Sequence, residues 1–158
     1  MHEVAEVAEV ILDTNSIEFN QKSGSILGKV YFCIGNEFFP DKDWSDFVVV
    51  VLGWWVEEIS KIEVGKTKTF TLNFMDGPFF ATGYLLGDNL VKIEFVKERL
   101  CGNDINHIAI CDIKQLMMCI LNAANDLVLE LEKRALDNND IARLKLLIKE
   151  AKVSNLIS

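Results

Sequence analysis

Apolar residues between positions 69 and 97 alternate with polar ones, so that Phe70, Leu72 and Phe74 fall on one side of an extended chain. A period of two is the spacing of a half-buried β-strand. Turn-forming residues interrupt the alternation at 75–78 and 87–89, which leaves links too short for anything but antiparallel neighbours. The pattern therefore predicts a three-stranded antiparallel meander over 69–97.

The N-terminal part of the chain has the same strand-like character. A β-branched and apolar run begins near Val7, and a second run covers residues 26–34, with a turn expected at 21–24 between them. A short edge piece is expected just before Pro40, because proline has no amide hydrogen for a central ladder.

Residues 43–62 carry a helical stripe instead, with Asp43 as the expected N-cap, Asp46 in the first turn and Gly65 just beyond the end. The four consecutive valines at 48–51 oppose this, at a cost of about 2 kcal/mol in helix propensity. Burial of the apolar stripe outweighs that cost several times. A helix is therefore preferred, and a strand over Phe47–Leu52 followed by a short helix is the alternative. The stripe consists of Trp44, Phe47, Val48, Val51, Leu52, Trp55, Ile59 and Ile62.

The C-terminal third repeats apolar residues at helical spacing in two segments. Asp112 is the expected cap of a long helix that ends near Leu136, and Asp140 is the expected cap of the last helix. One further short strand is expected at 107–111. The prediction is one α+β domain over residues 1–158, in which an antiparallel β-sheet (the N-terminal strands plus the 69–97 meander) is packed by a central helix near 44–62 and a C-terminal helical hairpin.

Charge is spread unevenly over the 158 residues. The chain has 24 acidic and 16 basic residues, and the whole formal net charge of −8 comes from residues 1–60. Such an acidic chain is unsuited to binding a phosphate backbone, so no nucleic-acid partner is expected. An acidic face for a basic protein partner is one interpretation, and charge that serves only solubility is the other.

The chain has the composition of a cytoplasmic protein that has no membrane partner. Its longest apolar run, 47–56, has ten residues, which is far below the length of a membrane span. The N-terminus carries acids where a secretory signal has bases, and the four cysteines form no CxxC pair.

Signatures of catalysis are weak, so no catalytic residue, cofactor or metal is assigned. The two histidines are 105 residues apart in sequence, and no glycine-rich phosphate-binding motif is present. Two other classes stay open. One is an enzyme or small-ligand protein with a pocket between sheet and helices, using Asp76 or the aspartates near position 43, and the other is a structural homo-oligomer.

The binding candidates come from the acidic front of the chain and from the central helix. Trp54 lies one position off the buried stripe, about 100° round the helix, with Glu57 and Glu58 one turn further on. An aromatic anchor beside acids is typical of a protein-binding hot spot. The full candidate set is Asp41, Asp43, Asp46, Trp54, Glu57 and Glu58.

Three strings, DWSDFVVVVLGWW at 43–55, LNFMDGPFF at 72–80 and LVKIEFV at 90–96, are similar to those of a family of small intracellular bacterial proteins. Some members of this family are uncharacterised, and others are grouped with immunity proteins of polymorphic toxin systems. The resemblance covers residues 37–97 and rests on aromatic and turn residues. It implies an α+β fold and tight binding to a cognate toxin, and it implies no particular site residue.

Overall fold

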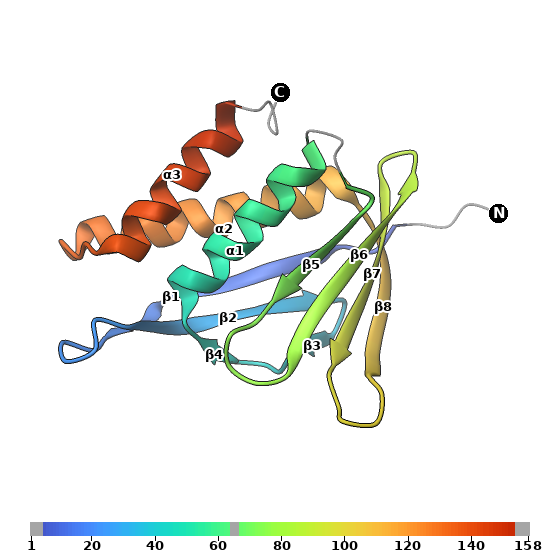
Figure 1. Cartoon of the computed structure of the whole chain (residues 1–158), viewed down its shortest axis with the longest axis horizontal. Coiled ribbons are helices and arrows are strands. Elements are labelled where there is room, and N and C mark those ends of the chain that lie inside the picture. Colours follow the sequence, from blue (N-terminus) through green and yellow to red (C-terminus); the bar gives the residue numbers. More distant parts are fainter. Residues whose placement is uncertain (1–4, 64–66, 154–158) are drawn as a thin grey trace.

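The computed structural model describes residues 5–63 and 67–153, which form an α+β fold of two antiparallel sheets and three helices (Figure 1). The strands are β1 (Ala8–Phe19), β2 (Ile26–Ile34), β3 (Glu37–Phe39), β4 (Ser45–Asp46), β5 (Thr69–Asn73), β6 (Phe79–Gly87), β7 (Leu90–Lys97) and β8 (Asp104–Asp112), and the helices are α1 (Val48–Glu63), α2 (Ile113–Lys133) and α3 (Asn139–Val153). The α+β class is thus confirmed. None of the described helices combines the length and the apolar character needed to cross a bilayer.

The strands divide into two sheets, where the sequence pattern predicts one. In the first sheet β2 is central: it pairs with β1 on one side and with β3 and β4 on the other. The second sheet has the order β5-β6-β7-β8, so the predicted meander is confirmed and extended by one strand. Helix α1 follows β4 and packs against both β2 of the first sheet and β5 of the second.

The backbones of the two sheets are joined just before β1. The Glu6 amide donates to the Ile110 carbonyl at 2.8 Å, and Glu6 forms an isolated parallel bridge with Cys111. After Glu6 the chain turns away from β8 and runs beside β2 as β1.

The start of α1 differs from the prediction. The helix begins at Val48, and Asp43 is not its N-cap, because Asp43 has a left-handed backbone with φ 63° and Ser45–Asp46 pairs with β2. The amide of Val51 donates to the Phe47 carbonyl at 2.9 Å, which makes Phe47 the residue that opens the helix. The alternative of a strand over Phe47–Leu52 is wrong, and Gly65 lies outside the described residues.

The two C-terminal helices form the expected pair, with different ends. The cap of α2 is confirmed: the Asp112 side chain accepts from the Gln115 amide at 3.0 Å. The helix stops at Lys133 and not near Leu136, because Ala135 takes a left-handed φ of 55° and closes it. The cap of α3 is Asn138, whose Oδ1 accepts from the Ile141 amide at 2.8 Å, in place of the predicted Asp140.

Aromatic rings from both sheets meet around Trp55 of α1. The Trp55 indole stacks on Phe32 of β2 with 4.9 Å between ring centroids, and it forms a T-shaped pair with Phe74 at 5.2 Å. Phe32 also contacts Phe95 of β7 at 5.3 Å. These contacts fix the rotation of α1 about its axis, because a fully buried tryptophan has few ways to fit into a close-packed core.

We expect Gly83→Ala to lower the free energy of unfolding by about 1–3 kcal/mol, the usual cost of overpacking. A Cβ at Gly83 in β6 would lie 2.2 Å from the ring of buried Phe70 on the neighbouring strand. Gly53→Ala in α1 is the control, because its Cβ meets Leu147 at an ordinary 3.8 Å, and helix propensity predicts a gain of about 0.5–1 kcal/mol. Urea denaturation measures both variants; equal effects of the two would contradict the packing argument.

Candidate functional site

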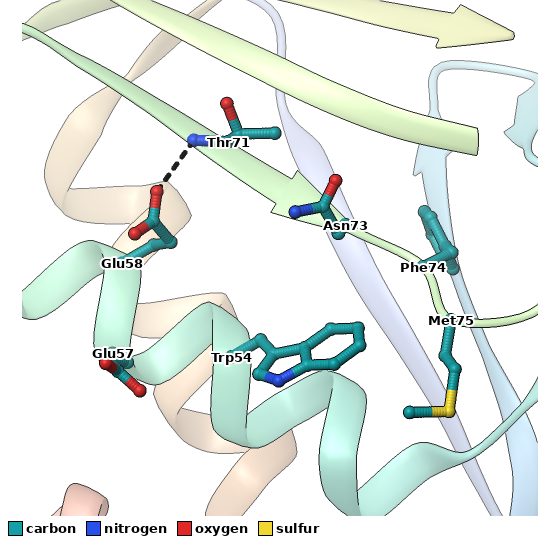
Figure 2. A pocket seen from close by; sticks show the side chains of 7 residues that line it. All are labelled: Trp54, Glu57, Glu58, Thr71, Asn73, Phe74 and Met75. Atoms are coloured by element: carbon teal, nitrogen blue, oxygen red, sulfur yellow. Dashed lines mark hydrogen bonds between the residues drawn. The ribbon is translucent and has the colours of Figure 1, made fainter. Parts of the chain in front are cut away.

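An open groove of about 560 Å³ lies between α1 and the outer edge of β5, and we call it the Trp54 groove (Figure 2). One wall comes from α1 and the other from β5 and the residues that follow it. The lining residues are Trp54, Glu57, Glu58, Thr71, Asn73, Phe74 and Met75.

The walls of the groove are held together by side chains of α1 that bond the backbone of β5. The Trp55 indole donates to the Asn73 carbonyl at 2.8 Å. Glu58 Oε1 accepts from the Thr71 amide at 3.0 Å (Figure 2). Thr71 and Asn73 point these groups away from β6, since β5 is an end strand of its sheet. The helix therefore covers an edge that would otherwise be free to pair with another chain.

Trp54 gives the groove a large apolar surface. Because neighbouring helical residues lie about 100° apart, the burial of Trp55 turns Trp54 outward, where 38% of the residue is exposed. Met75 is 41% exposed on the other side of the groove. Two large apolar side chains are thus accessible to a ligand in one depression.

The two carboxylates of the groove already form ion pairs with basic side chains of the same chain. Glu57 Oε2 lies 2.9 Å from an Arg143 guanidinium nitrogen, and Glu58 Oε2 lies 2.7 Å from Lys61 Nζ. The hydrogen bond and the charge of Glu58 raise the pKa of Lys61. Ion pairs at the protein surface contribute little to stability, so an incoming cation can replace Lys61 or Arg143 at little cost.

Only part of the predicted set of site residues is gathered here. Trp54, Glu57 and Glu58 line the groove together. Asp41 and Asp43 are exposed and do not line it: the Asp41 side chain accepts from the Lys42 amide, and Asp43 lies 3.8 Å from Lys29.

Asp46 is buried, with 1% of the residue exposed, and serves the structure beside the groove. Its carboxylate accepts from the Trp44 indole at 3.1 Å, from the Phe47 amide at 2.7 Å and from the Asp76 amide at 3.1 Å. It thereby ties the start of α1 to the turn after β5. Burial raises the pKa of Asp46, and these hydrogen bonds, which favour the charged form, oppose the increase.

Other candidates for chemistry lie apart from the groove. Burial raises the pKa of the Cys111 thiol to about 11, so at neutral pH it stays a thiol, which is a poor nucleophile. The imidazole of His107 contacts Glu37 of β3 at 2.8 Å. Within residues 5–63 and 67–153, no group of three or more histidine, cysteine or acidic side chains is arranged to hold a metal ion.

The β5 side of the groove was not foreseen. Alternation on β5 indicates that Thr71 and Asn73 point away from Phe70 and Leu72, but it does not say that α1 covers this side. Met75 lies in a segment that the sequence marked only as a turn.

Comparison of the chain with protein-family models, curated proteins and solved structures gave no match.

We expect Asp46→Ala to lower the free energy of unfolding by about 2–4 kcal/mol, because the Trp44, Phe47 and Asp76 donors lose their acceptor in a buried site. Asp76→Ala is the matched control, since only the backbone of Asp76 takes part and its side chain is exposed. Chemical denaturation measures both. Comparable losses in the two variants would contradict the role given to the Asp46 carboxylate.

We also expect the folding stability to depend on pH through the Asp46 carboxyl group. Because burial raises the pKa of Asp46 in the folded state, the folded protein binds this proton more tightly than the unfolded chain does. The stability contributed by Asp46 is therefore greatest below the ordinary value of 3.8 and decreases as the pH rises through the raised pKa. Unfolding measured against pH for the wild type and Asp46→Asn should show the wild type losing stability relative to the variant over this window; a difference that is constant or grows with pH would contradict the assignment.

Proposed function

We propose that the protein is a non-enzymatic interaction module that binds a cationic segment of a protein partner in the Trp54 groove. The observation that carries the proposal is the exposed Trp54 indole beside two carboxylates, Glu57 and Glu58, in one open depression. Tryptophan is among the residues that most often dominate binding energy at protein interfaces.

The groove chemistry favours a lysine or arginine side chain as the occupant. Such a side chain gains a cation–π contact on an indole face and an ion pair with a carboxylate of the same groove. Arg143 and Lys61 hold these carboxylates in the free protein and act as tethered competitors. Their exchange for partner cations leaves the number of ion pairs unchanged, so the gain comes from Trp54 and Met75.

In its most concrete form the partner is a basic toxin domain, which the protein inhibits as an immunity-type binder. Two observations support this form. The resemblance to the immunity-like bacterial family covers residues 37–97, which include every lining residue of the groove, and the net charge of −8 belongs to residues 1–60. An acidic surface accelerates the encounter with a cationic domain, which Trp54 then anchors. The same proposal places the protein in the bacterial cytoplasm, and the free state of all four cysteines is consistent with a reducing compartment.

A small cationic ligand is the second candidate. The groove volume of about 560 Å³ falls within the range of about 300–1,000 Å³ that is common for small-molecule sites. Free arginine amide distinguishes the two candidates, because a small-ligand site binds it as tightly as it binds an arginine within a peptide.

The test is a titration of the protein with the peptide Gly-Arg-Gly-Arg-Gly, followed by NMR shifts and calorimetry at 50 mM and 500 mM salt. We expect shifts at Trp54 and Met75, and affinity that falls at least tenfold in Trp54→Ala and severalfold in the double variant Glu57→Gln, Glu58→Gln. Glutamine keeps an acceptor for the Thr71 amide, so this double variant removes charge without removing that hydrogen bond. Arg143→Ala should raise affinity, because it removes a competitor.

Leu129→Ala and Glu150→Gln are the controls, since they remove an exposed apolar side chain and an exposed charge elsewhere. The partner form is tested by retention of proteins from the source organism on the immobilised wild type and on Trp54→Ala. A cationic protein held by the wild type and lost from the variant supports it. The proposal fails if the Trp54→Ala protein binds peptide and partner as the wild type does.

A further inference from the structure

The outer edge of β1 contains a short open stretch of backbone. The Val30 amide bonds the Trp44 carbonyl beside β4, so the alternating residues Tyr31 and Cys33 of β2 direct their backbone groups toward β1. In the β1–β2 pairing, Tyr31 lies opposite Ile11 and Cys33 lies opposite Glu9. The residues between and beside these two, Ala8, Val10 and Leu12, therefore point their amide and carbonyl groups away from β2.

Both ends of this outward edge are closed by other parts of the chain. At one end the Ala8 carbonyl accepts from Gln115 Nε2 at 3.5 Å, and Glu6 is bridged to Cys111 of β8. At the other end Arg134 donates to the carbonyls of Thr14 and Ile17 at 3.0 and 2.7 Å.

The middle of the edge stays open. No partner among the described residues pairs with the outward amide and carbonyl groups of Val10 and Leu12. Unpaired strand edges are recognition sites for extended chains, because each added residue pair forms main-chain hydrogen bonds.

A groove of about 270 Å³ runs along this open stretch, between β1 and α2. Its volume is below the usual range for small-molecule sites. It extends along four consecutive residues of β1, which is about 13 Å of extended chain. The lining consists of Glu9, Val10, Ile11 and Leu12 from β1 and Cys119, Asn122, Ala123 and Asp126 from one face of α2.

Side chains on the two faces of β1 give such a chain a sequence preference. Glu9, Ile11 and Asp13 alternate with the core-facing Val10 and Leu12 and so share the outer face. An added strand would place every second side chain beside Glu9 and Asp13, and the others beside α2, where Ala123 leaves room for small residues. Lys29, across from Asp13 in the register, is held by Asp43 at 3.8 Å. Asp126 adds negative charge on the α2 side.

We propose that the β1–α2 groove binds an extended segment of a partner protein as an added strand, with the backbone of Val10 and Leu12 forming its hydrogen bonds and with cationic residues alternating with small apolar ones. This site is separate from the Trp54 groove and does not depend on the function proposed for that groove. A second copy of the chain is a poor occupant, because its own β1 would bring Glu9 and Asp13 against the same acids.

The test uses the peptide Lys-Val-Lys-Val-Lys with blocked ends and residue-resolved amide exchange by NMR. In the free protein we expect the amides of Val10 and Leu12 to exchange faster than the amide of Ile11. Saturating peptide should slow exchange at Val10 and Leu12 at least fivefold. The same peptide with both valines N-methylated, which lacks the donors of an added strand, should bind at least tenfold more weakly.

Charge variants test the preference for a cationic segment. The double variant Glu9→Lys, Asp126→Lys should bind the lysine peptide at least tenfold more weakly and should bind Glu-Val-Glu-Val-Glu in preference to it. Glu18→Lys is the matched control on β1, since Glu18 lies beyond the stretch that lines the groove, and it should change affinity less than twofold.

Four results would overturn the proposal. The first is unchanged exchange at Val10 and Leu12 when peptide is present. The second is equal binding of the N-methylated peptide. The third is protection of these amides by self-association without peptide, which would make a second copy the occupant. Shifts confined to Trp54 and Met75 would also overturn it, while leaving the function proposed for the Trp54 groove intact.

Discussion

The contact between α1 and the edge of β5 is the constraint on which the rest of the molecule depends. Trp55 stacks on Phe32 of the first sheet and donates to the Asn73 carbonyl of the second, so one side chain joins the helix and both sheets. A buried indole whose N–H has found an acceptor fixes both the depth and the rotation of the helix. The exposure of Trp54 and the position of Glu58 at Thr71 follow from that rotation.

Edge strands organise the candidate surfaces. Each sheet has an end strand beside a helix, β5 beside α1 and β1 beside α2 (Figure 1). At β5, side chains of α1 bond the outward Thr71 amide and Asn73 carbonyl, and the groove beside them presents side chains. At β1 the covering groups reach only the two ends of the strand, and the groove between them presents backbone. The free strand edges are thus covered in two different ways. The Trp54 groove offers side chains to a ligand, whereas the β1–α2 groove offers backbone hydrogen-bonding groups.

Much of this arrangement was readable from the sequence, and the failures have physical causes. The meander and the two C-terminal helices follow from apolar periodicity, which is a local property. The start of α1 was misplaced because Trp44 and Phe47 continue its apolar stripe, while Asp43 and the pairing of Ser45–Asp46 with β2 keep the backbone out of the helix. The end of α2 was misplaced because Ala135 adopts the left-handed conformation that usually signals glycine.

By itself, the sequence determined the meander, the central helix, the two C-terminal helices, the acidic front and the grouping of Trp54, Glu57 and Glu58 on one turn of a helix, since these depend on residue type and on spacing along the chain. Only the tertiary structure decided that the strands form two sheets, that Asp46 is buried and that Thr71, Asn73 and Met75 face Trp54. Those features depend on contacts between residues distant in the chain, such as the 18 positions between Trp55 and Asn73. No local pattern encodes which of several apolar faces meet, because that choice is made by the packing of the whole core.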